Sequence, residues 1–488
     1  MRANNLTLLT DLYELTMMQG YFKNPTNQAV IFDMFYRVNP CGGSFAIAAG
    51  LEQMIEYIEN LHFSDEDIDY LRSLHIFEED FLTYLSDFHF TGDIYAIPEG
   101  TVVFPREPLV KVIAPIMEAQ LVETAILNII NHQSLIATKA ARVCYAARGD
   151  GIMEFGLRRA QGPDAGIYGA RAAVIGGCAG TSNVLTGQMF NVPVLGTHAH
   201  SWIMSFPDEY TAFKTYARMY PDSCTLLVDT YDVLKSGVPN AIRVFEEMRE
   251  EGVKLTHYGI RIDSGDLAYL SKEAYKMLAA AGFDDATISA SSDLDEYLID
   301  SLKSQDAKIT SWGVGTNLIT SKDNPAFGGV YKLAAVKDAG SNSFTPKIKL
   351  SENTEKVTNP GNKTVYRIYS KSTGKIKADM ICLTDEIFDP EETMVIFDPV
   401  DTWKKTKVLG GTYELRELLV PVIREGKRIY TSPEVMDIRE YCRKEQNTLW
   451  DESRRLVNPQ KVYVDLSQKL FDLKKNLLEE MSEKNLDE

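Results

Sequence analysis

The sequence predicts an α/β protein with a mixed α/β domain at its N-terminal end, a parallel α/β barrel in the middle and an added C-terminal region. Three observations support this prediction. The chain has 488 residues, which exceeds the ~250 to 300 residues that one hydrophobic core usually serves. Short apolar runs alternate with helical stretches after Gly149, and a polar stretch rich in Gly and Pro follows Gly328. We therefore expect domains at 1–140, 141–335 and 336–488, and leave open that part of the later chain returns to the first domain.

The first 140 residues combine helical and β-rich segments. Residues 10–21 (TDLYELTMMQGY) predict a first helix with Thr10 as its N-cap. The residues expected near one face of this helix are Leu12, Leu15, Thr16 and Met18. Residues 29–36 and 93–113 have the composition of strands, whereas 51–88 and 116–148 have helical patterns. This mixture predicts an α/β domain.

Short apolar runs recur through the middle of the chain, separated by stretches with a helical pattern. The runs cover residues 152–155, 192–195, 225–228, 258–262, 286–290 and 309–314. Strands that alternate with helices are typical of βαβ units and a parallel sheet. So many runs in ~170 residues favour a closed or nearly closed barrel, with a doubly wound open sheet as the alternative.

The C-terminal region has a less regular pattern. Its first part, Lys337 to Lys363, is polar and contains Gly and Pro residues, which indicates a mobile loop. The sequence leaves open whether this loop closes over a substrate. In residues 462–481, Leu and Met recur at intervals of three or four residues among charged residues, which predicts a terminal amphipathic helix. We expect it to pack onto the body of the protein, with partner binding as the alternative.

Composition excludes several classes of protein. The formal net charge of -18 disfavours binding to nucleic acid or to an anionic membrane surface. The six cysteines are far apart and form no CxxC pair, which is typical of reduced cysteines rather than a disulfide scaffold. Asp11 and Glu14 interrupt the N-terminal apolar residues, so no signal peptide is expected. These features predict a cytoplasmic protein that does not span a membrane.

Polar residues follow most of the predicted strands. In a parallel α/β barrel the reactive groups come from the C-terminal ends of the strands, so these residues are expected to meet. They are Arg158, His198 and His200, Asp229, Arg261 and Asp263, Asp293, and the turn Gly313 to Thr316. Arginines for anions, carboxylates for hydroxyls or Mg²⁺, and a glycine-rich turn for phosphate together suit a phosphorylated sugar. Each aspartate alone could instead cap the helix that follows.

Two of these strand ends suggest more specific chemistry. His200 can act as a nucleophile for phosphoryl transfer, whereas a core or hydrogen-bonded role is expected for His198. A zinc site is disfavoured because no third His or Cys lies nearby in sequence. Phe155 can stack on a flat ring while Arg158 pairs with its carboxylate or with phosphate, so this loop suits an aromatic acid. The alternative is that Phe155 belongs to the core and the arginines are surface charges.

Seven blocks of the sequence resemble the nicotinate phosphoribosyltransferases, in the order of that family and across about two thirds of the chain. The blocks are TDLYELTMMQGY (10–21), EFGLRRAQGPDAG (154–166), GTSNVLTG (180–187), GTHAHSWIMSF (196–206), VDTYD (228–232), IRIDSGDL (260–267) and GVGTNL (313–318). The resemblance implies a type II phosphoribosyltransferase fold, with an irregular α/β barrel and an added C-terminal region. It also implies a homodimer in which Tyr13 of a second copy covers the nicotinate ring opposite Phe155.

The resemblance assigns roles residue by residue. His200 matches the histidine that ATP phosphorylates in this family, and His198 matches no such residue. Arg158 and Arg261 match arginines of the base and phosphate subsites. The other matches are Asp229 and Asp263 near pyrophosphate and ribose, Gly315 and Thr316 in the 5′-phosphate loop, and Arg37 and Lys363 toward the pyrophosphate. Asp293 is also placed in the substrate site, and Asp229 could hold Mg²⁺ through a bound water.

Ser182 bears on which base is used. Related enzymes that use nicotinamide carry an aspartate where this chain has Ser182, and removing that negative charge suits the nicotinate carboxylate. The implied reaction joins nicotinate to phosphoribosyl pyrophosphate while ATP and water become ADP and phosphate, with Mg²⁺, and yields nicotinate mononucleotide and pyrophosphate. The alternatives are a nicotinamide or quinolinate phosphoribosyltransferase, or a non-catalytic barrel that binds a nucleotide.

Overall fold

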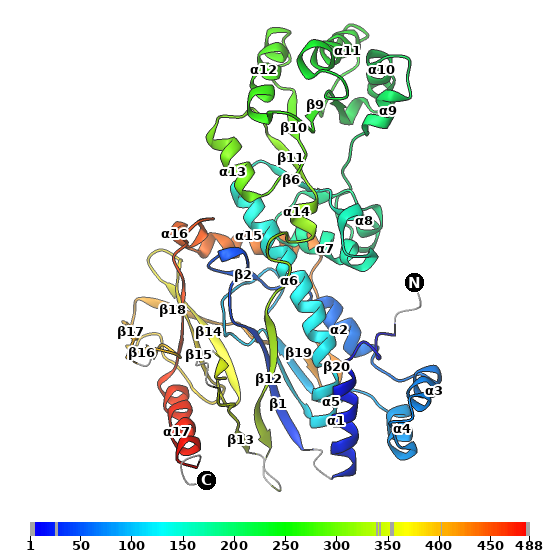
Figure 1. The fold of residues 1–488 in the computed structure, drawn as a ribbon. Coiled ribbons are helices and arrows are strands. Elements are labelled where there is room, and N and C mark those ends of the chain that lie inside the picture. The colour runs from blue at the N-terminus through cyan, green and yellow to red at the C-terminus, as the bar shows by residue number, and fades with distance from the viewer. Residues whose placement is uncertain are drawn as a thin grey trace. The chain divides into compact units, whose positions relative to one another are not determined.

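The computed structural model describes residues 5–24, 28–337, 340, 343–351, 356–401 and 403–484 (Figure 1). The chain forms two compact units. The first unit consists of Met1–Leu135, Ala326–Pro433 and Tyr441–Glu488, and the second consists of Ile136–Pro325 and Glu434–Glu440. The chain therefore returns to the first unit after it has built the second.

A seven-stranded sheet organises the N-terminal part of the first unit. Its strand order is β13-β12-β1-β5-β3-β19-β20. The strands are β1 (Ala29–Tyr36), β3 (Asp93–Ala96), β5 (Val110–Pro115), β12 (Gly329–Lys337), β13 (Phe344–Pro346), β19 (Val420–Arg424) and β20 (Lys427–Arg428). The pair β2 (Ala46–Ile47) and β4 (Val102–Val103) forms a separate ribbon. The β1 strand pairs antiparallel with β5 and β12 and is almost wholly buried, as its apolar sequence predicts.

Helices pack around this sheet. They are α1 (Leu12–Lys23), α2 (Leu51–Glu59), α3 (Asp65–Ser73), α4 (Glu79–Ser86), α5 (Ile116–Leu121) and α6 (Glu123–Ala146), which continues into the second unit. The predicted N-cap of α1 is wrong, because Asp11 occupies that position and the hydroxyl of Thr10 donates to the carboxylate of Glu14. The buried face of α1 carries Leu15 and Met18, whereas Leu12 and Thr16 are exposed.

A second sheet of the first unit has the strand order β17-β16-β21-β15-β14-β18. Its strands are β14 (Lys363–Ser370), β15 (Ile376–Leu383), β16 (Met394–Phe397), β17 (Lys405–Val408), β18 (Tyr413–Glu417) and β21 (Tyr463–Leu466). The late helices are α15 (Val435–Thr448), α16 (Asp451–Arg454) and α17 (Gln468–Lys484). The predicted terminal helix therefore begins later than expected, because Leu466 pairs with Ile381 of β15 as part of β21.

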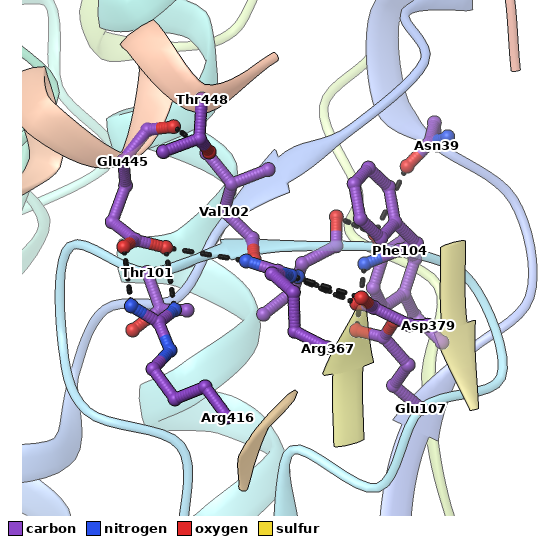
Figure 2. Close-up of polar contacts among 12 residues, drawn as sticks. Asn39, Thr101, Val102, Phe104, Glu107, Arg367, Asp379, Arg416, Glu445 and Thr448 are labelled. Atoms are coloured by element: carbon purple, nitrogen blue, oxygen red, sulfur yellow. Dashed lines mark hydrogen bonds and ion pairs between the residues drawn. The ribbon is translucent and has the colours of Figure 1, made fainter. Parts of the chain in front are cut away.

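A buried ionic cluster connects elements of the first unit (Figure 2). Arg367 of β14 is fully buried, and its Nη2 lies 2.6 Å from Oδ2 of Asp379 on β15. Its Nη1 lies 3.2 Å from Glu445, which in turn pairs with Arg416 of β18 at 2.7 Å. The carboxyl of Glu107 lies beside Asp379. Mutual neutralisation allows these charges to be buried.

The stretch predicted as a mobile loop is partly regular. It begins at Lys337 in β12, includes β13, and ends at Lys363, the first residue of β14. Phe344 to Pro346 pair antiparallel with β12, which gives this segment a place in the seven-stranded sheet. Residues 338–339, 341–342 and 352–355 lie outside the described residues.

The second unit contains a six-stranded parallel sheet of order β7-β6-β11-β10-β9-β8. Its strands are β6 (Gly151–Glu154), β7 (Gly180–Thr181), β8 (Cys224–Leu227), β9 (Tyr258–Ile262), β10 (Thr287–Ala290) and β11 (Ser311–Val314). Its helices are α7 (Pro163–Ile175), α8 (Val184–Phe190), α9 (His200–Met204), α10 (Glu209–Met219), α11 (Val238–Glu250), α12 (Leu267–Ala280), α13 (Glu296–Ser304) and α14 (Thr316–Ile319). This curled parallel sheet confirms the predicted α/β class, although its order leaves β7 and β8 as edges.

One predicted strand of this sheet is wrong. Residues 192–195 form only a single bridge, from Val194 to Thr181, and the sequence pattern missed β7. Pro193 has no N–H to donate to a ladder, which limits pairing along this segment. The other five apolar runs match β6, β8, β9, β10 and β11 within a few residues.

No helix in the described part of the chain is long and apolar enough to cross a membrane. All six cysteines are free thiols, in agreement with the sequence prediction.

Candidate active site

The C-terminal ends of the parallel strands surround a cavity of about 270 Å³ in the second unit. It is lined by Phe155, Arg158, Arg159, Arg261, Asp263, Ser291, Ser292, Asp293, Gly313, Gly315 and Thr316. Most of these residues were predicted for the substrate site from their places after strands. The cavity combines one aromatic ring, three arginines and two aspartates, which suits a ligand with both a flat ring and anionic groups.

Phe155 is held against the glycine-rich turn. Its backbone N–H donates to the carbonyl oxygen of Val314 at 2.8 Å. A Cβ added at Gly313 would lie 2.6 Å from the Phe155 ring, and one at Gly315 would lie 3.2 Å from its carbonyl oxygen. The glycines therefore make room for Phe155 in addition to opening the backbone for phosphate.

Arg261 is oriented by several acceptors on the cavity wall. Its Nε donates to Oγ of Ser291 at 2.9 Å, and Nη2 lies 3.6 Å from the carboxylate of Asp263. Its Nη1 donates to the hydroxyl of Thr197. Burial lowers the pKa of Arg261, and the charge of Asp263 opposes that shift. The result is a guanidinium group held in a fixed orientation on the cavity wall, where it can contribute positive charge toward an anionic ligand.

His200 lies next to the two predicted acids. Its Nδ1 is 3.1 Å from the hydroxyl of Thr230, while Nε2 is 3.9 Å from Oδ1 of Asp229 and 4.0 Å from Oδ2 of Asp263. The side chain of His200 is 40% exposed, so the imidazole is accessible from solvent. The structure thus brings His200, Asp229 and Asp263 together, and Asp263 also lines the cavity.

Asp229 provides a test of whether Mg²⁺ fits. Its Oδ2 accepts from the backbone N–H of Asp263 at 3.1 Å and from the hydroxyl of Ser264 at 2.6 Å, whereas its buried Oδ1 has no hydrogen-bond partner. No group of three or more His, Cys, Asp or Glu side chains among the described residues could hold a metal ion. Mg²⁺ commonly takes one or two carboxylates and completes its shell with water and substrate phosphates. Asp229 and Asp263 fit that pattern.

His198 has a different environment from His200. It is buried, its Nε2 accepts from the backbone N–H of Leu227 at 3.3 Å, and its ring lies edge-on to Tyr216. Burial lowers the pKa of His198 to about 4, so the imidazole is neutral at neutral pH. This confirms the predicted hydrogen-bonded role.

Some predicted site residues do not line the cavity. Ser182 follows β7, and its backbone N–H donates to the carbonyl oxygen of Glu154 at 3.0 Å. Tyr13 and Arg37 belong to the first unit, where Tyr13 is 46% exposed and Arg37 lies over the ring of Phe35.

Lys363 also belongs to the first unit, and it is buried. Its Nζ lies 2.7 Å from Oδ2 of Asp33 and donates to the carbonyl oxygen of Gly361 at 2.8 Å. The ammonium group of Lys363 is therefore paired within the first unit, and its contact with pyrophosphate stays a prediction.

Several residues of the site were not singled out from the sequence. Arg159, Ser291 and Ser292 line the cavity, and Thr230 contacts His200. Arg159, Ser292 and Thr230 each adjoin a predicted residue, and Ser291 is two residues from Asp293, so their positions after strands were the available signal. Ser292 adopts φ 124°, a conformation that L residues rarely take, and this shape could not be anticipated from its residue type.

Family models of three domains match the chain in order. They are the nicotinate phosphoribosyltransferase N-terminal domain at residues 8–131, the nicotinate phosphoribosyltransferase family at 151–371 and the C-terminal domain at 362–474. The nicotinate phosphoribosyltransferase of Bacillus subtilis (strain 168) is 46% identical, over 99% of each chain. The human nicotinate phosphoribosyltransferase is 32% identical, over 98% of this chain and 97% of that protein.

Solved structures agree with these matches. The crystal structure of human nicotinic acid phosphoribosyltransferase superposes with a TM-score of 0.83 at 30% identity, over 96% of this chain and 99% of the other. The nicotinate-nucleotide pyrophosphorylase from Pyrococcus furiosus shares the fold, with a TM-score of 0.69 at 22% identity over 92% of this chain and 97% of that one. Family models, relatives and structure agree over nearly the whole chain, and the chain belongs to the nicotinate phosphoribosyltransferase family.

Proposed function

We propose that this enzyme makes nicotinate mononucleotide from nicotinate and phosphoribosyl pyrophosphate, a step of NAD biosynthesis from nicotinate. The observation that carries the proposal is the cavity at the strand ends, where Phe155 and the arginines meet Asp263 and the glycine-rich turn. Relatives named for this activity match the chain from end to end.

Phe155, Arg158 and Ser182 form the proposed base subsite. The ring of Phe155 offers a flat face for the pyridine ring, and the exposed Arg158 can pair with the carboxylate of nicotinate. Ser182 adds no negative charge where an aspartate would repel that carboxylate. This charge balance favours nicotinate over nicotinamide.

Transfer needs alignment rather than a protein nucleophile. The ring nitrogen of nicotinate attacks the anomeric carbon, and the bond from that carbon to pyrophosphate breaks. Arg261, already oriented by Ser291, supplies positive charge toward the anionic groups, while Asp263 can accept from ribose hydroxyls. We assign the backbone N–H groups of Gly315 and Thr316, which line the cavity, to the 5′-phosphate. When bound at Asp229 and Asp263, Mg²⁺ would neutralise charge on the departing pyrophosphate.

ATP hydrolysis is coupled to transfer through His200. An imidazole nitrogen attacks the γ-phosphorus of ATP and ADP leaves, and water later removes the phosphoryl group as phosphate. The exposed imidazole and its two neighbouring carboxylates support this assignment. We also propose that the enzyme is a homodimer in which Tyr13 of the second copy covers the base. We further propose that the protein is located in the cytoplasm.

A product assay with different bases tests the proposed function. Purified protein is incubated with phosphoribosyl pyrophosphate, Mg²⁺ and one of three bases, which are nicotinate, nicotinamide and quinolinate. The mononucleotide formed from each base is quantified by chromatography. We expect conversion of nicotinate at a kcat/KM at least ~10²-fold above that of nicotinamide. Preferred use of nicotinamide or quinolinate would show that the protein is the phosphoribosyltransferase for that base instead. If no base is converted, the protein would be a non-catalytic barrel that binds a nucleotide.

A further inference from the structure

Glu154 is a buried acid at the edge of the proposed base subsite that the reaction described above does not use. It is the last residue of β6, directly before Phe155, and its exposed fraction is 0%. A carboxyl group in such a place is costly unless its oxygens receive hydrogen bonds. Its partners therefore indicate what the side chain does.

Each carboxyl oxygen of Glu154 holds a different loop. Oε1 accepts from the backbone N–H of Gly156, in the loop that carries Phe155 and Arg158. Oε2 accepts from the hydroxyl of Thr181 at 2.6 Å, at the end of β7. The carbonyl oxygen of Glu154 also accepts from the N–H of Ser182 at 3.0 Å. One residue thus joins the loop of the aromatic ring to the loop of Ser182.

The contacts of Thr181 and Gly156 extend this connection. Oγ1 of Thr181 accepts from the N–H of Asn183 at 3.0 Å, so the same hydroxyl that donates to Glu154 also fixes the residue after Ser182. A Cβ added at Gly156 would lie 2.5 Å from Cβ of Ile319 and 2.8 Å from Oε1 of Glu154. The loop after β6 is therefore confined between Glu154 and α14, with little space to move.

We infer that Glu154 is the positioning residue of the base subsite, which sets the separation between Phe155 and Ser182 so that a flat ring bearing a carboxylate fits between their loops. The inference rests on the proposed function, because it assigns a role within the nicotinate site. Glu154 acts through Gly156 and Thr181 and makes no contact with the reacting atoms. It consequently affects recognition of the base and leaves recognition of phosphoribosyl pyrophosphate nearly unchanged.

Steady-state kinetics with Glu154→Gln and Thr181→Val test this role. Glu154→Gln keeps the shape of the side chain but replaces the carboxyl group, which accepts from Gly156 and Thr181, by an amide. Thr181→Val removes the hydroxyl of Thr181 at nearly constant side-chain volume. Each is expected to raise the KM for nicotinate about tenfold, the effect of about 1.4 kcal/mol for one disrupted buried hydrogen bond. The KM for phosphoribosyl pyrophosphate should change by less than about twofold.

Ser271→Ala is the matched control. Ser271 is a fully buried hydroxyl of α12 in the same unit, and it contacts Ala268 and Lys308 rather than Glu154. It should leave both KM values unchanged even where it lowers the melting temperature. The double variant Glu154→Gln/Thr181→Val should raise the KM for nicotinate no more than the larger single change, because both remove the same connection.

The outcomes separate this inference from the proposed function. A nicotinate KM that is unchanged in both variants, or KM values for both substrates that rise together, would overturn the role of Glu154 while wild-type activity stands. If the wild-type enzyme does not convert nicotinate, the proposed function fails and this role fails with it. Should Glu154→Gln not fold, Thr181→Val decides the question alone.

Discussion

Ser182 is the residue at which the preference for nicotinate over nicotinamide can be tested most directly. A carboxylate introduced there would face the carboxylate of nicotinate in a poorly solvated site, where like charges repel strongly. Ser182→Asp should lower kcat/KM for nicotinate at least ~10²-fold and raise relative use of nicotinamide. Competition kinetics with both bases measures the ratio, and Ser182→Asn serves as the uncharged control. An unaltered base preference would remove Ser182 from the site.

Gly313 tests whether Phe155 must pack against the glycine-rich turn. Gly313→Ala would place a methyl group 2.6 Å from the Phe155 ring, so the ring has to move. We predict a rise of about tenfold or more in the KM for nicotinate, since a displaced ring loses its stacking surface. Gly151→Ala, where an added Cβ meets nothing within 4 Å, is the matched control in the same unit. Equal kinetics for the two variants would show that the contact is irrelevant.

At single positions, sequence reasoning performed well where a residue follows a strand. Arg158, Asp263 and Asp293 line the cavity as expected, because strand ends in a parallel sheet converge. Glu154 and Lys363 could not be placed in this way. The role of the first depends on hydrogen bonds to Thr181, and the burial of the second depends on Asp33, and both partners are distant in sequence.

At the scale of elements, the apolar pattern of the sequence predicted the presence of strands better than it predicted their first and last residues. The run at 258–262 coincides with β9, whose five residues alternate little and are almost wholly buried. The run at 192–195 failed because Pro193 cannot donate to a ladder, and the two-residue β7 is too short for any pattern. Leu466 fits the spacing of α17 but belongs to β21, since pairing with β15 outweighs local periodicity.

The ionic cluster that joins β14, β15 and β18 predicts a dependence of stability on pH. Burial, and next the charge of Asp379, raise the pKa of Glu107 well above its ordinary value. A raised folded-state pKa means that wild-type stability falls as pH rises above the unfolded value of ~4.3, because the fold disfavours the ionised acid. Glu107→Gln removes this loss and keeps a donor beside Asp379.

Glu107→Gln should therefore gain free energy of unfolding relative to wild type between about pH 4 and pH 8, on the order of 1 to 3 kcal/mol. Urea unfolding of both proteins across this range measures the difference. Glu414→Gln, which makes the same change at an exposed position on β18, is the control. A difference that shrinks as pH rises would contradict the raised pKa.

At the scale of the whole molecule, the two units differ in how many separate segments of the chain build them. The first unit is assembled from three separate segments, whereas the sheet of the second unit comes from one continuous stretch. Local βαβ patterns therefore revealed the second unit from the sequence. Strands such as β12 and β19, which join β1 and β3 from far along the chain, carry no local sign of their partners.

The proposed dimer predicts complementation between inactive variants. If Tyr13 of one copy completes the site of the other, Tyr13→Ala and His200→Asn are each impaired as homodimers. A heterodimer then contains one intact site, so mixing and reassociating equal amounts should restore up to about a quarter of wild-type activity. Activity no higher than the sum of the separate variants would exclude a shared site, and Tyr70→Ala provides an exposed-tyrosine control.

The most direct test of the central claim is the ratio of ADP to nicotinate mononucleotide formed by the wild-type enzyme, His200→Asn and His257→Asn. His257 is an exposed histidine of the same unit and serves as the control. We predict a ratio near one for wild type and the control. His200→Asn should form the mononucleotide slowly and no ADP, because transfer needs no protein nucleophile but ATP hydrolysis does. ADP formation by His200→Asn at the wild-type ratio would contradict the account.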